Sequence, residues 1–463
     1  MKKTLLIIFT FKYPFEPPTE QFLDDELRFL AEEDMDILLV PSAREKKDAK
    51  YAFPETRENI SVCEIRRSCL PCETFFGLLS AAGQAGCLRR DLGRIRKEAQ
   101  PQNRTYARKE TLKEYVQAGA LCRHFIRQIP DGVLRNRDRI ILYSYWLNPA
   151  AAAEALFKKH LERKYRVSVT AYARAHGDGD LYRQGMDHCR PCLALLNEEI
   201  DAVFPISRNG LESLEKDGIR RAETYRLGVK KQVPFLPSRN ATPLVVSCSV
   251  VNENKRVEKI ADILSCFRQD IRWVHFGGGP GEQSLRVYCE KVLPGNVRWD
   301  LRGWTSHDDI MDFYRKETPD LFLNVSLMEG IPVSIMEAMS YSIPCAATDA
   351  GASGEIVADG RNGFLLSVDF DVRETARRIG DHLSGDEETK TCMRENAYAA
   401  FEREYDSAAN YAAFARRIVS DGADAPRKPD RTECSTPVKK PAEPHSKMNS
   451  TMAAQEADHR ELL

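Results

Sequence analysis

The stretch that decides the fold runs from residue 243 to residue 348, where apolar runs alternate with amphipathic ones. The apolar runs are PLVVSCSVV (243–251), IRWVHFGG (271–278), VRWDLRGW (297–304), LFLNVS (321–326) and IPCAAT (343–348). Between them lie KRVEKIADILSCF (255–267), GEQSLRVYCEKVL (281–293), HDDIMDFYRKE (307–317) and PVSIMEAMSY (332–341), which have the pattern of helices. Strands that alternate with helices through short connections are typical of a doubly wound parallel sheet.

The N-terminal part of the chain repeats this alternation. Strands are predicted at TLLIIFTF (4–11), DILLVPS (36–42), RIILYSYW (139–146), the start of VSVTAYARAHGDGDLY (167–182) and IDAVFPIS (200–207). Helices are predicted at QFLDDELRFLAEE (21–33), NPAAAAEALFKKHLERK (148–164) and from Arg208 towards Asp217. The sequence therefore predicts an α/β protein with two Rossmann-like, doubly wound domains.

The domain boundaries follow from composition. At 463 residues the chain exceeds the roughly 250 to 300 residues at which single cores stop growing. The proline-rich VPFLPSRNATP (233–243) predicts a linker, with an N-terminal domain at 1–235 and a C-terminal domain at 236–395. We expect helices at 396–421 to pack back toward the N-terminal domain, and residues 422–463, rich in Pro, Lys, Glu, Ser and Asp, to be a disordered tail.

The bulk numbers predict a soluble, cytoplasmic protein. Hydrophobic residues make up 42% and charged residues 30% of the chain, and a formal net charge of -1 gives no reason to expect nucleic-acid binding. MKKTLLIIFTFKYPF (1–15) has no small-residue cleavage site and an apolar run too short to span a bilayer, so we interpret it as a buried strand. The 13 cysteines then favour free thiols in a reducing compartment.

Two C-x-x-C pairs, Cys69/Cys72 and Cys189/Cys192, could in principle form a zinc site. More than a hundred residues separate them and each has proline inside or beside it, so buried or loop thiols are favoured. Asp178 and Asp180 are the nearest approach to an Asp-x-Asp metal motif after a strand, and their position is not typical of such a site. We therefore predict no metal.

Residues 87–139 are basic, and two interpretations remain open. The segment is either a solvated helical face, in which Glu98, Glu110 and Glu114 balance the cations, or a peripheral contact with anionic lipid or a lipid-linked acceptor. The solvated face is favoured. The cations include Arg89, Arg90, Arg94, Arg96, Lys97, Arg104, Arg108, Lys109, Lys113, Arg123 and Arg127.

The chemistry is concentrated in LFLNVSLMEGIPVSIMEAMSYSIPCAATDAGASGEIV (321–357). A strand breaks at Glu329-Gly330 and restarts as a helix with Pro332 in its first turn, where the missing N–H costs nothing. Free amides and the partial positive charge of the helix start suit a diphosphate. Glu329 at the break and Glu337 in the helix could hold two sets of sugar hydroxyls at different depths.

This segment resembles the C-terminal signature of glycosyltransferase family four, retaining enzymes of the GT-B fold with two domains facing across a cleft. The likeness rests on Glu-x7-Glu around GIPVSIM and on NGFLL (362–366), and extends to VVSCSVVNENKRVEKIADIL (245–264) and WVHFGGGPGEQSLR (273–286). YSYW (143–146), ARAHGDGDLY (173–182) and VFPISRNG (203–210) look most like bacterial exopolysaccharide enzymes of the amylovoran type.

The resemblance implies a role for each matched residue. Lys255 would hold the donor diphosphate, Glu337 the nucleotide ribose, and Glu329 the donor sugar, in a pocket also lined by Gly330, Ile331, Pro332 and Val333. His176 would lie beside the transferred sugar and the acceptor, and Leu301, Arg302 and Gly303 would run past the base. The glycines of GGGPG (277–281), including Gly277 and Gly278, either cradle phosphate or form a tight turn.

The sequence departs from the family pattern in two places. Val250 stands where the family commonly has arginine, so Arg256, Arg208 or Arg302 would have to supply the second contact with the diphosphate. The N-terminal loop has Pro17-Pro18-Thr19-Glu20-Gln21 in place of paired glycines. Glu20, Gln21, Arg174 and Arg208 are the candidates for the acceptor side.

Taken together, the resemblance implies a retaining transferase that moves a hexose from a nucleotide-diphosphate sugar to a saccharide or lipid-linked saccharide, with no metal or other cofactor. Synthesis of exopolysaccharide, capsule or another cell-surface glycan is the expected setting. The alternatives are a catalytically silent GT-B partner protein in a polysaccharide assembly complex, and a GT-B epimerase or phosphorylase.

Overall fold

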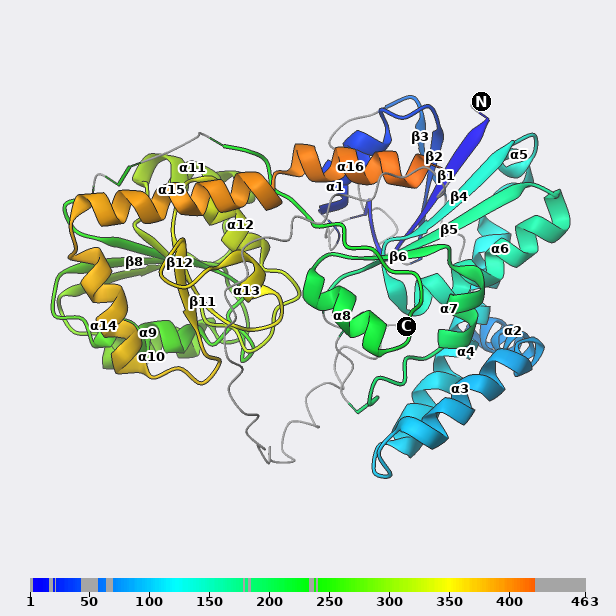
Figure 1. The fold of residues 1–463 in the computed structure, drawn as a ribbon, viewed down its shortest axis with the longest axis horizontal. Helices are drawn as coiled ribbons and strands as arrows, with labels where there is room; N and C mark the ends of the chain where they lie inside the picture. The colour runs from blue at the N-terminus through cyan, green and yellow to red at the C-terminus, as the bar shows by residue number, and fades with distance from the viewer. Residues whose placement is uncertain are drawn as a thin grey trace. The chain divides into compact units, whose positions relative to one another are not determined.

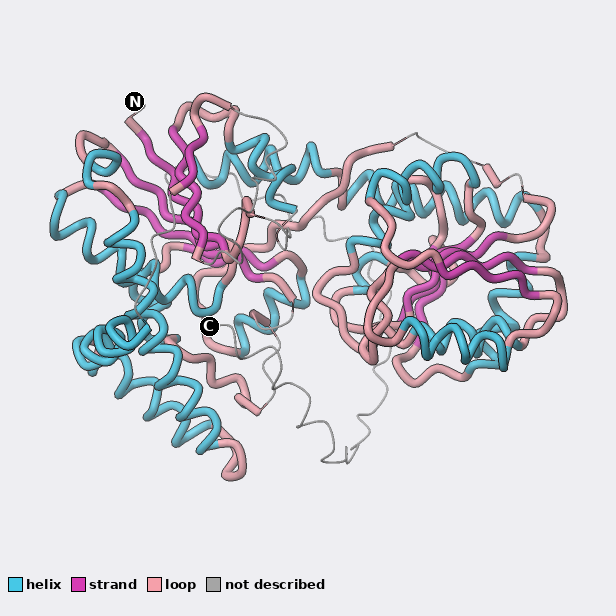
Figure 2. Tube along the Cα trace, turned by 180° about the vertical axis from the view of Figure 1, so that it is seen from behind, coloured by secondary structure: helices cyan, strands magenta, loops and turns pink. Residues whose placement is uncertain are grey.

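The computed structural model describes residues 3–15, 20, 22–42, 57–63, 70–177, 180–181, 185–232, 237–238 and 240–420. Within these ranges the chain forms two parallel sheets of six strands, each with helices on both faces (Figures 1 and 2). Residues 1–420 form one compact unit. The tail expected at 422–463 lies outside the described residues.

The first sheet has the strand order β3-β2-β1-β4-β5-β6, and every neighbouring pair is parallel. Its strands are β1 (Thr4–Thr10), β2 (Asp36–Pro41), β3 (Ile60–Val62), β4 (Arg139–Ser144), β5 (Ser168–Ala175) and β6 (Ala202–Pro205). Because helices cover both faces, central strands such as β1 are continuous apolar runs rather than alternating ones. β3 was not predicted, since its three residues carry too little pattern.

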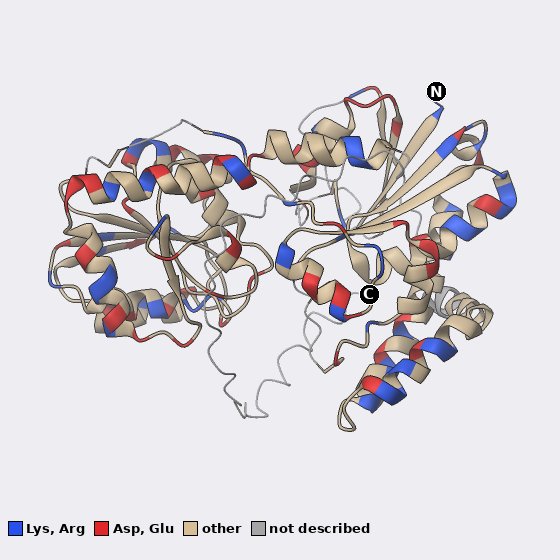
Figure 3. Ribbon diagram, in the orientation of Figure 1, with Lys and Arg blue, Asp and Glu red and all other residues tan. Residues whose placement is uncertain are grey.

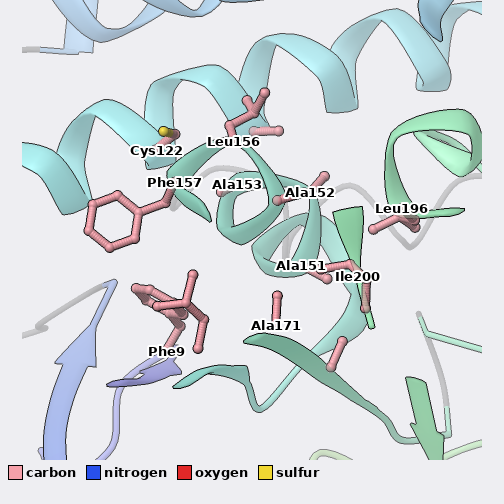
Figure 4. Close-up of a cluster of buried hydrophobic side chains, with 14 of the residues drawn as sticks. Phe9, Cys122, Ala151, Ala152, Ala153, Leu156, Phe157, Ala171, Leu196 and Ile200 are labelled. Atoms are coloured by element: carbon pink, nitrogen blue, oxygen red, sulfur yellow. The ribbon is translucent and has the colours of Figure 1, made fainter. Parts of the chain in front are cut away.

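Four of the helices of the first sheet, α2 to α5, lie between β3 and β4 in the chain. The helices are α1 (Phe22–Leu30), α2 (Leu70–Gly83), α3 (Ala85–Glu98), α4 (Arg104–Gln128), α5 (Asp131–Leu134), α6 (Ala152–Tyr165), α7 (Leu193–Glu199) and α8 (Arg208–Lys216), with a π-helical turn at Leu147–Ala151. Figure 4 shows how α4 and α6 close one face of the sheet over Phe9. The rings of Phe9 and Phe125 stack with centroids 4.2 Å apart.

The second sheet has the order β12-β11-β10-β7-β8-β9 and is also parallel. Its strands are β7 (Leu244–Cys248), β8 (Ile271–Phe276), β9 (Val297–Leu301), β10 (Leu321–Asn324), β11 (Cys345–Thr348) and β12 (Gly363–Leu366). Its helices are α9 (Val257–Ser265), α10 (Glu282–Val292), α11 (His307–Glu317), α12 (Val333–Ser340), α13 (Ser353–Ile356) and α14 (Val372–Leu383). All five strands expected here from the sequence are confirmed, and β12 is additional.

The last two described helices pack on different cores. α15 (Glu387–Glu404) buries Ala397 and Phe401 in the core of the second sheet. α16 (Ser407–Val419) buries Phe414 and Ile418 with Leu23 in the core of the first. The chain therefore ends its described part on the sheet where it began.

Each sheet has one point where the order of its strands reverses. β1 lies between β2 and β4, and β7 lies between β8 and β10. In open parallel sheets ligands bind beyond the carboxyl ends of the strands at such switch points. The loops after β7 and β10 carry Lys255 and Glu329, so these two residues lie at the switch point of the second sheet.

Candidate functional site

The loop after β10 leads directly into the start of α12. Pro332 is the N-cap of this helix, with φ −76° and ψ 101°, and no side chain caps it. The expectation that Pro332 lies in the first turn is therefore off by one residue, because its backbone is still extended. The amides of Val333 and Ser334 have no acceptor within the helix, and the first turn carries no acidic residue. This end of α12 is thus suited to an anion.

Lys255 and Glu329 form an ion pair, and Glu329 lies in the loop that enters this helix. The Lys255 Nζ lies 2.7 Å from Glu329 Oε1, and the two side chains are 25% and 10% exposed. Ser326 Oγ donates to the same oxygen at 2.7 Å and Asn324 Nδ2 at 3.1 Å. The carboxylate is therefore held by three donors through Oε1, and one of these donors is the ammonium of Lys255.

Asn254 ties the loops that carry these two residues together. Its Nδ2 donates to the carbonyl of Met328 at 3.1 Å, and its Oδ1 accepts from the Met328 amide at 3.0 Å. Its carbonyl accepts from the amide of Leu327 at 2.8 Å. The sequence did not single out Asn254, Asn324 or Ser326; their position at the ends of strands was the available signal.

Glu337 points to a partner that the sequence did not predict. Its Oε1 lies 2.9 Å from Nε2 of His307, the first residue of α11. The hydrogen bond to this carboxylate raises the pKa of His307 above its usual value. The Glu337 side chain is 15% exposed. The Glu337 carboxylate is therefore partly accessible. Its Oε1 is hydrogen-bonded to His307, whose charge depends on pH.

His176 is buried between two aromatic rings at the end of β5. Its ring centroid lies 4.6 Å from that of Tyr145 and 4.7 Å from that of Trp146. Burial lowers its pKa to about 3, with the charge of Arg174 acting in the same direction, so the imidazole is neutral at physiological pH. Nε2 is buried and has no hydrogen-bond partner among the described residues. An unpaired ring nitrogen of this kind is available to a bound hydroxyl.

Asp180 fixes the loop that carries His176. Its Oδ2 accepts from the His176 amide at 3.1 Å and the Leu147 amide at 3.2 Å, and its Oδ1 accepts from the Asn148 amide at 3.1 Å. Burial raises its pKa to about 6 despite these bonds. The role of Asp180 is thus to position backbone, and Asp178 and Gly179 lie outside the described residues.

Gly177 and Gly330 bring the two loops of the site into contact. A Cβ built on Gly177 would lie 2.6 Å from the Cα of Gly330, closer than real Cβ atoms approach other heavy atoms. Only glycine permits this contact. It places the residue after His176 directly against the residue after Glu329.

The glycines after β8 form a tight packed turn. A Cβ on Gly277, whose φ is +120°, would lie 2.0 Å from the carbonyl oxygen of Ser249, and the Gly277 amide donates to the Gly303 carbonyl at 2.8 Å. A Cβ on Gly278 would lie 2.8 Å from the Trp304 ring. Close packing of backbone therefore explains why glycine stands at position 277, as the tight-turn interpretation predicts. Leu301 ends β9 and is 7% exposed.

The arginines proposed to replace the missing one at Val250 are engaged elsewhere. Arg256 donates to the carbonyls of Val325 and Val368 at 2.8 and 2.9 Å. Arg302 pairs with Asp300 at 2.9 Å and lies over the ring of Phe313. Both guanidinium groups are therefore bound to protein groups in this structure.

Arg208 takes part in a different contact. Glu355 accepts from the backbone amides of Arg208 and Asn209 at 3.0 and 2.7 Å, and from the Arg226 guanidinium at 3.0 Å. The carboxylate thus satisfies donors at the start of α8, where Ser207 is the N-cap. The Arg208 amide is bound by protein, so only its exposed side chain is available to a ligand.

Two acceptor-side expectations are corrected. Arg174 is fully buried, lies 3.5 Å from Glu26 and stacks 4.3 Å over Phe414, so it faces the core under α16 and cannot contact an acceptor. Glu20 is 1% exposed, and its carboxylate accepts from three backbone amides of residues 11–13 and from the Trp146 indole. It organises the loop rather than presenting a free carboxylate. Gln21 lies outside the described residues.

Other sequence features lie away from this site. The described residues include no group of three or more His, Cys, Asp or Glu side chains placed to hold a metal, and Cys189 and Cys192 are buried. Cys69 and the side chain of Cys72 lie outside the described part.

A cavity of about 480 Å³ opens at the amino ends of the second sheet's strands, beside Asp320 and Arg394. None of the helices in the described ranges could cross a membrane.

The arginines of α3 are partly neutralised. Arg90 pairs with Glu198, and Arg94 pairs with Glu98 at 2.6 Å and donates to the carbonyl of Asp217. Arg89 and Arg96 are exposed.

Comparisons of sequence find matches for the second half of the chain. Residues 229–400 match the family described as Glycosyl transferases group 1. A GDP-mannose-dependent alpha-mannosyltransferase of Mycolicibacterium smegmatis is 27% identical over 44% of this chain and 53% of its own length. The O-antigen biosynthesis glycosyltransferase WbnH of Escherichia coli is 27% identical over 42% of this chain and 54% of its length. The chain thus spans about half the length of these relatives.

Comparisons of structure cover nearly the whole chain. The lipopolysaccharide outer core galactosyltransferase WaaB matches 90% of this chain and 99% of its own, with a TM-score of 0.59 and 14% identity. Anabaena Alr3699/HepE, solved in complex with UDP, matches 90% and 99% with a TM-score of 0.61 and 16% identity. At these identities the likeness shows the fold, which is the GT-B fold of glycosyltransferases, as the sequence predicted.

Proposed function

We propose that the protein transfers a hexose from a nucleotide-diphosphate sugar to a hydroxyl of a saccharide or lipid-linked saccharide, because residues 229–400 match the family described as Glycosyl transferases group 1 and the chain has the GT-B fold. The anomeric configuration is retained. The reaction belongs to the synthesis of a cell-surface polysaccharide in the cytoplasm, a setting supported by the name of the O-antigen relative.

The observation that carries the proposal is the ion pair of Lys255 with Glu329, which lies in the loop that enters the uncapped start of α12. Lys255 is 2.7 Å from Glu329, which belongs to the loop entering that helix. The cation and the free amides of α12 together would neutralise the diphosphate of the donor. Glu329 would accept hydrogen bonds from the donor sugar, and Glu337 from the ribose.

The proposed transfer needs no protein nucleophile and no metal. The bond between the anomeric carbon and the diphosphate oxygen breaks, while the acceptor oxygen bonds to that carbon on the same face. The acceptor proton passes to an oxygen of the departing diphosphate. Lys255 and the α12 amides stabilise the negative charge that develops on that group.

His176 fits a positioning and binding role in this scheme. Its neutral ring cannot supply a charge, and its unpaired Nε2 can bond a hydroxyl of the sugar or acceptor. The contact between Gly177 and Gly330 places the backbone next to His176 against the loop that carries Glu329.

The experiment that tests the proposal measures thermal shifts of the full chain with UDP-, GDP- and ADP-sugars, followed by calorimetry with the nucleotide that stabilises it most. Glu337→Ala should abolish binding. Unchanged affinity in that variant would argue against the site. Turnover is then measured with saccharide acceptors.

One observation favours a second candidate, a catalytically silent partner protein in a polysaccharide assembly complex. Val250 removes a cation, and Arg256 and Arg302 are held by other groups. A protein that binds assembly proteins yet neither transfers nor hydrolyses any donor would fit this alternative. An epimerase would change a nucleotide sugar without acceptor, which the same assays detect.

A further inference from the structure

The cavity of about 480 Å³ lies at the edge of the second sheet opposite to Lys255 and Glu329. Its walls are the residues that precede β7, β8 and β10 and the adjoining parts of α14 and α15. Lys255 and Glu329 follow β7 and β10, so the length of the strands separates them from this α15 cavity. Pockets for small organic molecules have volumes of roughly 300 to 1,000 Å³. The α15 cavity is therefore large enough for such a molecule and distinct from the candidate donor site.

One face of α15 lines the cavity. Glu387, Lys390, Thr391 and Arg394 follow the i, i+3, i+4, i+7 spacing of a single helical face, and all four border the cavity. Arg394 is 3% exposed, and its Nη1 donates to the carbonyl of Pro319 at 2.7 Å. Lys390 is paired with Glu387. This face of α15 therefore presents a hydroxyl and charges of both signs to the cavity.

Asp320 supplies a carboxylate that the fold holds in one orientation. Its Oδ2 accepts from the Leu244 amide at 2.8 Å and from Asn240 Nδ2 at 3.1 Å. Asn240 is held in turn, because the same Nδ2 lies 3.1 and 3.2 Å from the carbonyl oxygens of Glu317 and Thr318. No group in the described part of the chain donates to Oδ1 of Asp320. This oxygen is therefore a preorganised acceptor for a bound hydroxyl.

His382 adds a neutral polar group to the wall. Burial lowers its pKa, with Lys390 and Arg394 acting in the same direction and Asp320 opposing, so the imidazole is neutral at physiological pH. The ring packs edge-on against Phe364, with centroids 5.5 Å apart. Its nitrogens make no hydrogen bond to any residue that the structure describes. A neutral imidazole offers one donor and one acceptor to a ligand.

We infer that the α15 cavity is a second ligand site, which binds a neutral mono- or disaccharide. Its two cations are accompanied by the carboxylates of Asp270, Asp320 and Glu387. Figure 3 shows the same mixture of signs along α15. An anionic ligand would meet these carboxylates, and like charges brought together are unfavourable. Sugar hydroxyls both donate and accept, so they match walls that hold carboxylates, cations and an imidazole, and their hydrogen bonds to the charged groups are the stronger kind.

The test measures binding of neutral mono- and disaccharides of glucose, galactose and mannose to the full chain by saturation-transfer NMR and calorimetry, without nucleotide. We expect at least one sugar to bind. Thr391→Trp fills the cavity with an indole and should abolish binding. Lys390→Ala should weaken it about tenfold, because a hydrogen bond to a charged group is lost. Glu395→Trp, on the exposed side of α15, and Lys316→Ala, which removes a lysine paired with Asp312 of its own helix, are the matched controls.

Asp320→Asn tests the preorganised oxygen without emptying its position. The asparagine oxygen can still accept from the Leu244 amide, while an amide nitrogen takes the place of Oδ1. Binding of the sugar should therefore weaken about tenfold with little change in melting temperature. Unchanged binding in both Asp320→Asn and Lys390→Ala would contradict the proposed contacts.

The remaining outcomes separate the possible ligands and sites. No binding by the wild type, or binding that survives Thr391→Trp, would overturn the inference. Inorganic phosphate is the charged probe, and phosphate binding that Thr391→Trp removes, without binding of any neutral sugar, would assign the cavity to an anion instead. Sugar binding lost in His176→Ala would assign the sugar to the candidate acceptor side. Because the assay contains no donor, its failure is distinguishable from failure of the proposed transfer.

Discussion

The Nζ of Lys255 and the Oε1 of Glu329 lie 2.7 Å apart, although 74 residues separate them in the chain. The pair exists because β7 and β10 are neighbours, which brings the loops after both strands to the same edge of the sheet. Without a donor, the carboxylate holds the ammonium at the position where we propose that a diphosphate binds. The two groups therefore position each other before binding.

Replacing Lys255 tests this arrangement. Lys255→Ala should lower turnover by about a hundredfold or more, because a cation that stabilises the leaving diphosphate is lost. Lys259→Ala, in the first turn of α9 and paired with Asp262 at 3.0 Å, is the matched control and should have little effect. Steady-state kinetics and calorimetry with the preferred nucleotide are the measurements. Equal turnover in the two variants would remove Lys255 from the site.

The pair between His307 and Glu337 predicts a pH dependence of nucleotide binding. The pKa of His307 is raised by Glu337, with Asp308 acting in the same direction and Lys230 opposing. Below that pKa the imidazolium holds Glu337 Oε1, and as the pH rises through it the hold weakens. Affinity for the nucleotide should therefore increase as the pH rises through the raised pKa of His307.

His307→Gln should flatten this dependence, since glutamine does not titrate. His382→Gln, which changes another histidine of the second sheet, should leave it intact. Calorimetry across the pH range makes the comparison. A dependence that persists in His307→Gln would assign it to another group.

The contact of Gly177 with Gly330 predicts a variant that separates binding from transfer. A methyl group on Gly177 would push the two loops apart, since its Cβ would lie 2.6 Å from Gly330. Gly177→Ala should therefore reduce kcat about tenfold or more while nucleotide affinity is kept, because misplacing a contacting loop by a fraction of an ångström is costly. Gly295→Ala, with open space around its Cβ, is the control. Wild-type kcat in Gly177→Ala would show that the contact is dispensable.

The fold was largely predictable because parallel strands buried on both faces leave uninterrupted apolar runs. TLLIIFT of β1 and LVVSC of β7 are such runs, and helices with helical periodicity follow them. β3 escaped prediction because three residues show no period.

The site was predictable only in part. The roles of Lys255 and Glu329 came from the resemblance, and their proximity follows from the pairing of β7 with β10. His307 could not be found, because its bond to Glu337 depends on how α11 and α12 pack. Arg174 was wrongly assigned because its face of β5 is covered by α16, whose residues lie more than two hundred positions later.

Glu20 offers a test of the corrected role of the N-terminal loop. Its Oε1 accepts from the Phe11 amide at 2.8 Å and the Trp146 indole at 2.6 Å, and its Oε2 from the amides of Lys12 and Tyr13 at 2.9 and 2.8 Å. Glu20→Ala leaves buried donors without an acceptor and should destabilise the protein by roughly 3 kcal/mol.

Thermal unfolding of Glu20→Ala is compared with that of Glu32→Ala, whose side chain is 62% exposed and whose loss should be nearly neutral. If Glu20 has a structural role, Glu20→Ala lowers the melting temperature. The KM for the acceptor is then unchanged in the folded fraction of the variant, because the Glu20 oxygens do not contact the acceptor. The reverse result, an unchanged melting temperature with a raised KM for the acceptor, would show that the Glu20 carboxylate contacts the acceptor. The four hydrogen bonds favour the first outcome, since an acceptor hydroxyl would have to compete with them.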